Sequence, residues 1–165
     1  MKCKSVSTNK IIIESMSEKD TFNLGVLLSK VAFPKLVIYL NGELGAGKTH
    51  LTQGIAFGLG IKGIKSPSFI IVAEHNSGKI PLAHVDLYRL QTQSEVEELD
   101  LEYYVDQNYL LIIEWSERWT EKPKAESVEI NIKYTEHDNI RTIEIISSLE
   151  KIISHLKMLL TNIKI

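Results

Sequence analysis

A glycine-rich stretch, LNGELGAGKTHL from Leu40 to Leu51, constrains the fold of this chain more than any other feature. Within it, Gly42 to Thr49 satisfies G-x-x-x-x-G-K-[ST], a pattern whose glycines let successive backbone N–H groups turn inward and form an anion nest. The apolar run LVIYL that leads into it is typical of a strand buried on both faces. Lys48 to Phe57 is predicted to be a helix, and Gly58 and Gly60 are suitable terminators. A phosphate-binding loop requires this order of strand, loop and helix.

Each position of the pattern has a chemical task. Lys48 would neutralise the β- and γ-phosphates of a nucleotide, and Thr49 would offer its hydroxyl to Mg²⁺. The helix after the loop would direct the positive end of its dipole at the same phosphates. The alternative is a turn that matches the pattern by accident, but the strand and helix around it favour phosphate binding.

Other strands and helices are indicated by apolar runs and capping residues. The capping box that begins at Ser17 predicts a helix to about Ala32. A second capping box, at Thr92, predicts an acidic helix to about Tyr104. The predicted strands in this part of the chain are Ile11–Ile13, Phe69–His75, Lys79–Arg89 and Tyr109–Trp115. A tight turn at NSG joins the second of these strands to the third.

After Pro123 the pattern changes. VEINIKY and RTIEI alternate apolar and polar residues on either side of TEHDN, which predicts a half-exposed antiparallel hairpin. A stripe of apolar residues predicts a C-terminal helix at about 149–160, which packs on its own core or binds a partner. We therefore expect an α/β fold of the P-loop NTPase type, a three-layer sandwich with a mainly parallel central sheet and an antiparallel C-terminal hairpin.

Length and composition limit the class of protein. A chain of 165 residues with 44% apolar residues is about right for one domain, 1–165, and the first ten or so residues are expected to be flexible. The net charge of -2 argues against a broadly basic, DNA-binding surface, so we expect contact with nucleic acid to be made through a partner. The chain has a single cysteine, which favours a protein of the reducing cytoplasm. No apolar run approaches the roughly 20 residues that a membrane helix needs, so we expect no membrane contact.

Two acidic residues are candidates for the rest of a nucleotide site. Glu114 ends the run YLLIIE, where the carboxyl edge of a parallel sheet would bring it beside the loop as a Mg²⁺ ligand. A solvated carboxylate at a strand end is the alternative. Asp86 would share a strand face with His84 and Tyr88 if the strand continues that far, as part of a site or of a cross-strand hydrogen-bond cluster. Both interpretations of Asp86 remain open on spacing alone.

Four motifs in this order, G-E-L-G-A-G-K-T, S-P-S-F, H-V-D-L-Y-R and I-I-E-W, closely resemble the TsaE family of small bacterial P-loop ATPases. The resemblance runs from about Ser17 to Trp119, and H-V-D-L-Y-R with I-I-E-W is much more specific than the loop. It departs at Ser68, where the family usually has threonine. It also departs at His75, which stands at a family tyrosine position.

The resemblance implies roles for individual residues. It makes Lys48, Asp86 and Glu114 catalytic, and Thr49 and Glu114 ligands of Mg²⁺. The nucleotide-binding residues that it implies are Gly42, Glu43, Leu44, Gly45, Ala46, Gly47, Lys48, Thr49, His50, Thr21 and Trp115. The switch-like loop that it implies consists of Ser66, Pro67, Ser68 and Phe69. Without the resemblance, that segment would be predicted as a plain turn and Trp115 as a core residue.

The resemblance also implies an activity: Mg²⁺-dependent ATP hydrolysis that supports a TsaD-type transferase and its TsaB-type partner. That complex forms threonylcarbamoyladenosine at adenosine 37 of tRNAs reading ANN codons, so tRNA is met only through the complex. Two alternatives stay open. One is a nucleotide sensor without catalysis, and the other is a small-molecule P-loop kinase, which would need a basic lid that the three arginines of the chain do not suggest.

Overall fold

The computed structural model describes residues 1–122 and 124–161. Its strands and helices follow the chain in the order β1 (Lys2–Val6), β2 (Lys10–Ser15), α1 (Glu18–Leu28), β3 (Val37–Asn41), α2 (Lys48–Gly58), β4 (Val72–His75), β5 (Leu82–Asp86), α3 (Gln93–Glu97), α4 (Leu101–Asp106), β6 (Leu110–Glu114), the 3-10 turn η1 (Ser116–Arg118), β7 (Ser127–Tyr134), β8 (Arg141–Ile146) and α5 (Glu150–Thr161). Within these ranges, no helix is long and apolar enough to cross a membrane.

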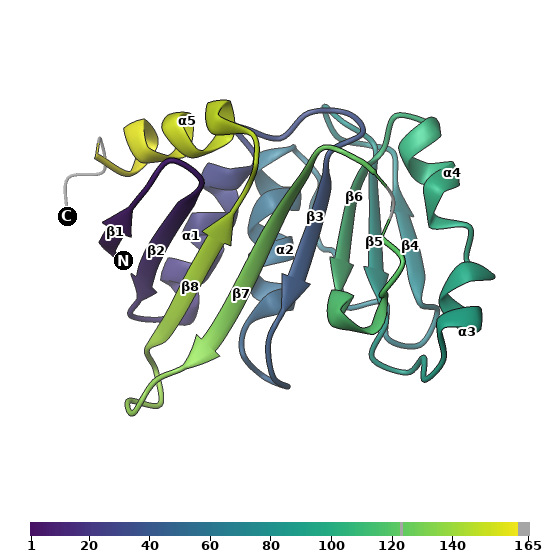
Figure 1. Ribbon diagram of the computed structural model, residues 1–165, viewed down its shortest axis with the longest axis horizontal. Helices are drawn as coiled ribbons and strands as arrows, with labels where there is room; N and C mark the ends of the chain where they lie inside the picture. The colour runs from purple at the N-terminus through teal and green to yellow at the C-terminus, as the bar shows by residue number, and fades with distance from the viewer. Residues whose placement is uncertain (123, 162–165) are drawn as a thin grey trace.

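One eight-stranded sheet has the order β1-β2-β8-β7-β3-β6-β5-β4. The central strands β7, β3, β6 and β5 are parallel, and the strands on either side of them are antiparallel to their neighbours. The predicted mainly parallel centre and the predicted antiparallel hairpin, β7–β8, are both present. In Figure 1, α1 and α2 lie behind the sheet, and α3 and α4 lie beyond β4 at the opposite end from β1.

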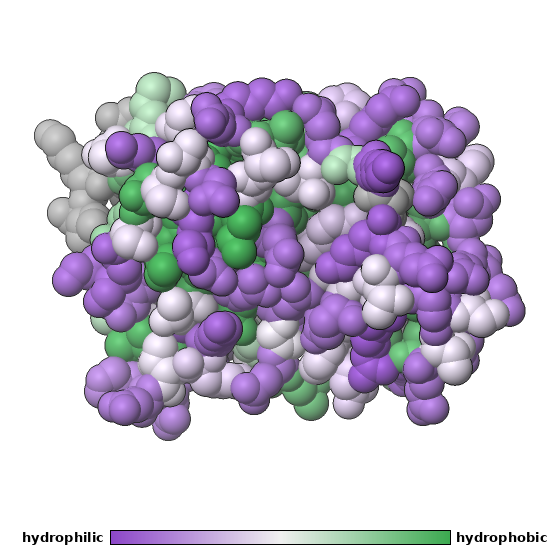
Figure 2. Space-filling model, viewed as in Figure 1, coloured by the Kyte–Doolittle hydropathy of each residue, from purple (hydrophilic) through white to green (hydrophobic). Residues whose placement is uncertain are grey.

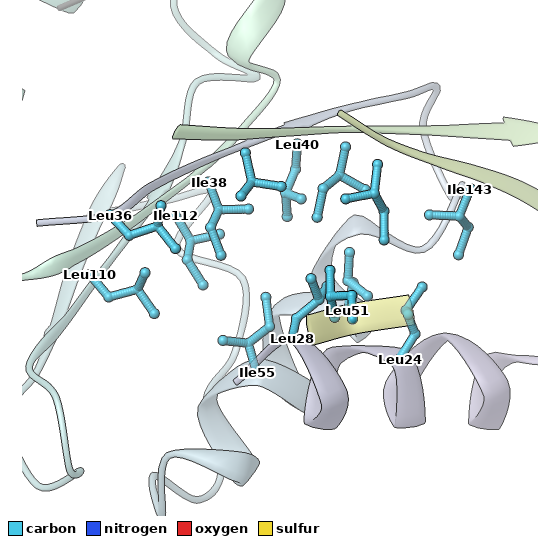
Figure 3. Close-up of a cluster of buried hydrophobic side chains, with 14 of the residues drawn as sticks. Leu24, Leu28, Leu36, Ile38, Leu40, Leu51, Ile55, Leu110, Ile112 and Ile143 are labelled. Atoms are coloured by element: carbon cyan, nitrogen blue, oxygen red, sulfur yellow. The ribbon is translucent and has the colours of Figure 1, made fainter. Parts of the chain in front are cut away.

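Two hydrophobic clusters make the fold three layers deep. Alternate residues of a strand point to opposite faces, so Ile38 and Leu40 of β3 join one cluster while Val37 and Tyr39 join the other. The first cluster packs the sheet against α1, α2 and α5, and Figure 3 shows its strand side chains directed toward α1 and α2. The second packs the other face against α3, α4 and Trp119. In Figure 2, hydrophobic patches reach the surface mainly in the half that holds β2, β8 and β7.

Helices α1 and α2 cross at glycines. A Cβ atom on Gly54 would lie 2.1 Å from the carbonyl oxygen of Phe22, and one on Gly25 would lie 2.3 Å from that of Leu51. Neither position can hold a larger residue unless the helices move apart. The crossing fixes the first turn of α1 beside the first turn of α2, where the glycine loop ends.

Several boundaries differ from the sequence-based prediction. Within the first ten residues, which were expected to be flexible, Lys2–Val6 forms the exposed edge strand β1. Helix α1 ends at Leu28 rather than near Ala32, and β4 begins at Val72 rather than Phe69. The last two differences lie at element ends, whereas β1 adds a strand before the first predicted one.

The predicted acidic helix through Tyr104 is wrong as a single helix. It is split into α3 and α4 by Asp100, whose φ of 46° is left-handed. Val96 and Leu101 are both buried in the same cluster. Five residues along a continuous helix lie about 140° apart, so the break allows both side chains to face the sheet.

Candidate nucleotide site

The register of the parallel strands brings the two predicted acids to the glycine loop. Glu114 is aligned with Leu40, just before the loop, on one side and with Asp86 on the other. All three residues stand at or near the carboxyl ends of their strands. Both acids are nonetheless almost fully buried, so neither is an ordinary solvated carboxylate at a strand end.

The loop between β3 and α2 needs glycine at two places for separate reasons. Gly42 lies against β7 so closely that a Cβ atom would be 2.4 Å from the carbonyl oxygen of Ile132. Gly47 has a φ of 111° and precedes the first residue of α2, where no side chain of the described residues caps the helix. The first-turn N–H groups of α2 are therefore left to bind a ligand, as an anion nest requires.

Lys48 is buried inside the loop that precedes it. Its Nζ donates hydrogen bonds to the carbonyl oxygens of Gly42, at 2.6 Å, and Glu43, at 2.9 Å, and lies 3.8 Å from the centroid of the Trp115 ring. Burial lowers the pKa of the Lys48 ammonium, while Glu114 is the strongest of the nearby carboxylates that act in the opposite direction. The structure thus holds a desolvated cation where the phosphates of a nucleotide would lie.

Glu114 joins the loop to the sheet through both of its oxygens. Thr49 donates to Oε2 at 3.0 Å, and the Nε2 atom of His84 lies 2.8 Å from Oε1. Thr52 also donates to Oε1, at the longer distance of 3.5 Å. The two residues predicted as Mg²⁺ ligands are therefore in direct contact.

Asp86 anchors the segment predicted to be a switch-like loop. Its Oδ2 accepts hydrogen bonds from the hydroxyls of Ser66, at 2.9 Å, and Ser68, and its Oδ1 accepts one from the backbone N–H of Tyr88 at 3.1 Å. The departure from threonine at Ser68 thus keeps the hydroxyl contact. Strand β5 ends at Asp86, so Tyr88 lies beyond the strand and does not share its face.

A cavity of about 620 Å³ is lined by most of the predicted site residues. Those that line it are Thr21, Leu44, Gly45, Ala46, Gly47, Lys48, Thr49, His50, Ser66, Ser68, Asp86, Glu114 and Trp115. Gly42, Glu43, Pro67 and Phe69 are not part of its lining. The first two contact Lys48 through their carbonyls, whereas the Phe69 side chain points outward and is 84% exposed.

Three further contacts place residues around the cavity. Thr21 is buried in the first turn of α1, 3.6 Å from where a Cβ of Gly47 would be, and its hydroxyl lies 2.8 Å from that of Ser15. His50 lies 3.7 Å from a carboxylate oxygen of Glu18. Trp115 is only partly buried: it packs against the second hydrophobic cluster and also lines the cavity.

The cavity also has a wall that the sequence did not predict. Asp138, Asn139 and Arg141 line it from the turn between β7 and β8 and from the start of β8. Tyr134 donates to the carbonyl oxygen of Leu44 at 2.8 Å and so ties the same hairpin to the glycine loop. TEHDN shows only a turn, so no sequence pattern could have assigned these residues to the site.

The residues present fit a magnesium ion that is shared with a nucleotide. No group of three or more His, Cys, Asp or Glu side chains in the part of the chain that the structure describes is placed to hold a metal alone. The adjacent oxygens of Thr49 and Glu114 are the donors that Mg²⁺ prefers, and this ion is usually bound by one or two protein oxygens, phosphates and water.

Comparisons with known proteins agree with this geometry. The family model described as "Threonylcarbamoyl adenosine biosynthesis protein TsaE" matches residues 15–143. A solved structure titled as that of Bacillus subtilis YdiB aligns with a TM-score of 0.75 and 29% identity, covering 98% of this chain and 97% of that one.

Similar sequences carry the same description. A tRNA threonylcarbamoyladenosine biosynthesis protein TsaE from Nostoc sp. is 45% identical over 73% of this chain and 75% of its own. A protein of that description from Haemophilus influenzae is 37% identical over 74% of this chain and 77% of its own. Another, from Bacillus subtilis, is 38% identical over 72% of this chain and 75% of its own. With the strand, loop and helix of a P-loop fold and a family match over most of its length, the chain belongs to the TsaE family of threonylcarbamoyl adenosine biosynthesis proteins.

Proposed function

We propose that this protein hydrolyses ATP with Mg²⁺ and thereby supports the formation of threonylcarbamoyladenosine in tRNA. One observation carries the proposal: Lys48, Thr49, Asp86 and Glu114 converge on a single cavity of about 620 Å³. Cavities of about 300–1,000 Å³ are the usual size for small-molecule ligands. A lysine, a hydroxyl and two carboxylates around a P-loop are the groups that phosphoryl transfer to water requires.

Each of these residues has a separate task. Lys48 and the N–H groups at the start of α2 hold the phosphates and balance their charge. Thr49 and Glu114 hold Mg²⁺, which when bound neutralises charge on the β- and γ-phosphates. Asp86, which already accepts two hydroxyl hydrogen bonds from the loop beside it, orients the attacking water. The Trp115 ring packs over the Lys48 ammonium.

The proposed setting is a protein complex in the cytoplasm. The partners are a TsaD-type transferase and a TsaB-type protein, with tRNA met through them. The net charge of -2 is consistent with an indirect contact with tRNA, since direct binding depends on basic side chains that neutralise phosphates.

Phosphate release from Mg-ATP tests the proposal. The purified chain is assayed alone and with the TsaB and TsaD proteins of its own organism, with Lys48→Ala as the control. We expect weak release by the chain alone, a higher rate with the pair, and none with the variant. If Asp86→Ala and Glu114→Ala released phosphate as fast as the parent with the partners present, the proposed mechanism would be wrong.

A nucleotide sensor without turnover is the second candidate, and the loop at Asp86 favours it. This loop is tied to the site by Ser66 and Ser68, while the next two side chains, Phe69 and Ile70, are exposed by 84% and 68%. A change at the nucleotide could thus alter a surface that a partner meets. Repeated rounds of tRNA modification with a non-hydrolysable ATP analogue would favour sensing, whereas a single round would favour hydrolysis.

A further inference from the structure

His84 lies behind the nucleotide site without touching it. The residue is fully buried in the middle of β5 and is not part of the cavity lining. Its Nε2 meets Oε1 of Glu114 at 2.8 Å, and the opposite oxygen of the same carboxylate accepts the hydrogen bond from Thr49. His84 is therefore one residue away from the proposed Mg²⁺ position.

The surroundings of the ring assign its hydrogen atoms. An ionised carboxylate only accepts hydrogen bonds, so Nε2 carries the hydrogen shared with Glu114. Nδ1 is buried and has no hydrogen-bond partner among residues 1–122 and 124–161. A hydrogen there would be an unpaired buried donor, which costs free energy. We therefore place the ring hydrogen on Nε2.

Without the His84 donor, the Glu114 carboxylate would lose its shortest hydrogen bond at Oε1. The remaining contact at Oε1 is from Thr52 at 3.5 Å, which is long for a hydroxyl hydrogen bond. A glutamate side chain with several rotatable bonds then loses its preferred orientation. The Oε2 atom would no longer be directed at Thr49.

We propose that His84 is a positioning residue that fixes the Glu114 carboxylate, so that Oε2 and the Thr49 hydroxyl face the same cation. The inference rests on the proposed function, because it takes Thr49 and Glu114 as the Mg²⁺ ligands. Residues that orient metal ligands in this way typically change metal affinity by about 10–100-fold when they are replaced.

Binding of a fluorescent ATP analogue separates this role from general damage to the fold. Affinity is measured in EDTA and then across a Mg²⁺ titration. For His84→Leu, we expect the affinity for the analogue in EDTA to equal that of the parent. The Mg²⁺ concentration that gives half of the Mg²⁺-dependent change in affinity should rise about 10–100-fold. His84→Gln, which keeps an N–H donor, should recover most of the difference.

His75→Leu is the matched control. His75 lies in the neighbouring strand β4, and its Nε2 is also buried without a partner among the described residues, but it contacts neither Glu114 nor the cavity. Its Mg²⁺ dependence should equal that of the parent. A Mg²⁺ dependence unchanged in His84→Leu would overturn the positioning role.

Two further measurements keep the outcomes distinct. If Glu114→Gln also keeps the parent's Mg²⁺ dependence, the proposed metal site itself fails. If only His84→Leu keeps it, the positioning role alone fails. In the parent protein without nucleotide, NMR of the His84 ring should show the hydrogen on Nε2, and a hydrogen on Nδ1 instead would contradict the proposal even if the variants do not fold.

Discussion

Replacing Gly54 with alanine tests the close crossing of α1 and α2. The new Cβ atom would lie 2.1 Å from the carbonyl oxygen of Phe22 and 3.0 Å from the Cα atom of Gly25. A carbon and a carbonyl oxygen normally approach to about 3.3 Å, so the helices must separate by about 1 Å. Since the nearest atoms belong to the backbone of α1, no side-chain rotation relieves the contact.

The expected loss of stability combines two opposing effects. Overpacking typically costs about 1–3 kcal/mol, and a rigid backbone contact belongs at the upper end. Alanine regains about 1 kcal/mol over glycine within a helix. The free energy of unfolding of Gly54→Ala should therefore fall by about 2 kcal/mol, which lowers the melting temperature by about 4–8 °C for a chain of this size.

Thermal unfolding followed by circular dichroism measures this change, and Gly58→Ala is the comparison. The Cβ atom of Gly58→Ala would meet the side chain of Ser29, at 2.0 Å from Oγ and 2.7 Å from Cβ. Ser29→Gly should thus rescue Gly58→Ala, whereas Phe22→Ala should not rescue Gly54→Ala, because the clash there is with the Phe22 backbone. A Gly54→Ala protein that melts at or above the parent temperature would refute the close crossing.

Three other predictions concern the nucleotide site. Lys48→Met should abolish ATP binding yet raise the melting temperature of the free protein in calorimetry. Burial lowers the pKa of Lys48, so the unfolded chain binds the Lys48 proton more tightly than the folded protein does. The parent should therefore gain stability as pH rises from the lowered pKa toward the ordinary value of 10.5, and the variant should not. Tyr134→Phe removes the hydrogen bond to the carbonyl oxygen of Leu44, worth about 1 kcal/mol, so titration calorimetry should show up to about fivefold weaker ATP binding; unchanged affinity would show that this bond does not hold the loop. In Trp119→Phe, the remaining Trp115 fluorescence should change on ATP addition because phosphates draw the Lys48 ammonium from the ring; a constant signal would contradict that contact.

The parts of the fold with strong local patterns could be predicted from the sequence. LVIYL and YLLIIE are continuous apolar runs, and they became the central parallel strands β3 and β6. The alternation in VEINIKY and RTIEI predicted the hairpin β7–β8. In each of these segments, burial of the side chains and the local pattern favour the same structure.

Features that depend on pairing between distant segments could not be predicted. The contact of His84 with Glu114 arises from the register of β5 against β6, which a single strand's sequence does not specify. The left-handed conformation of Asp100 lets Val96 and Leu101 both pack against the same face of the sheet. The sequence around Asp100 favours a helix, so it does not reveal this break. The placement of Arg141 beside the cavity depends on how the hairpin lies against the loop.

The hairpin β7–β8 sets how short a nucleotide-binding fragment of this chain can be. Gly42 is pressed against Ile132, Tyr134 holds the carbonyl of Leu44, and the turn that follows supplies a wall of the cavity. A fragment that stops after β6 would keep the whole glycine motif but lose the strand on which its loop rests. Truncation from the C-terminus should therefore end nucleotide binding once it removes residues of the hairpin, which ends at Ile146. Lengthening the turn at 135–140 should change access to the cavity while the glycine loop stays intact.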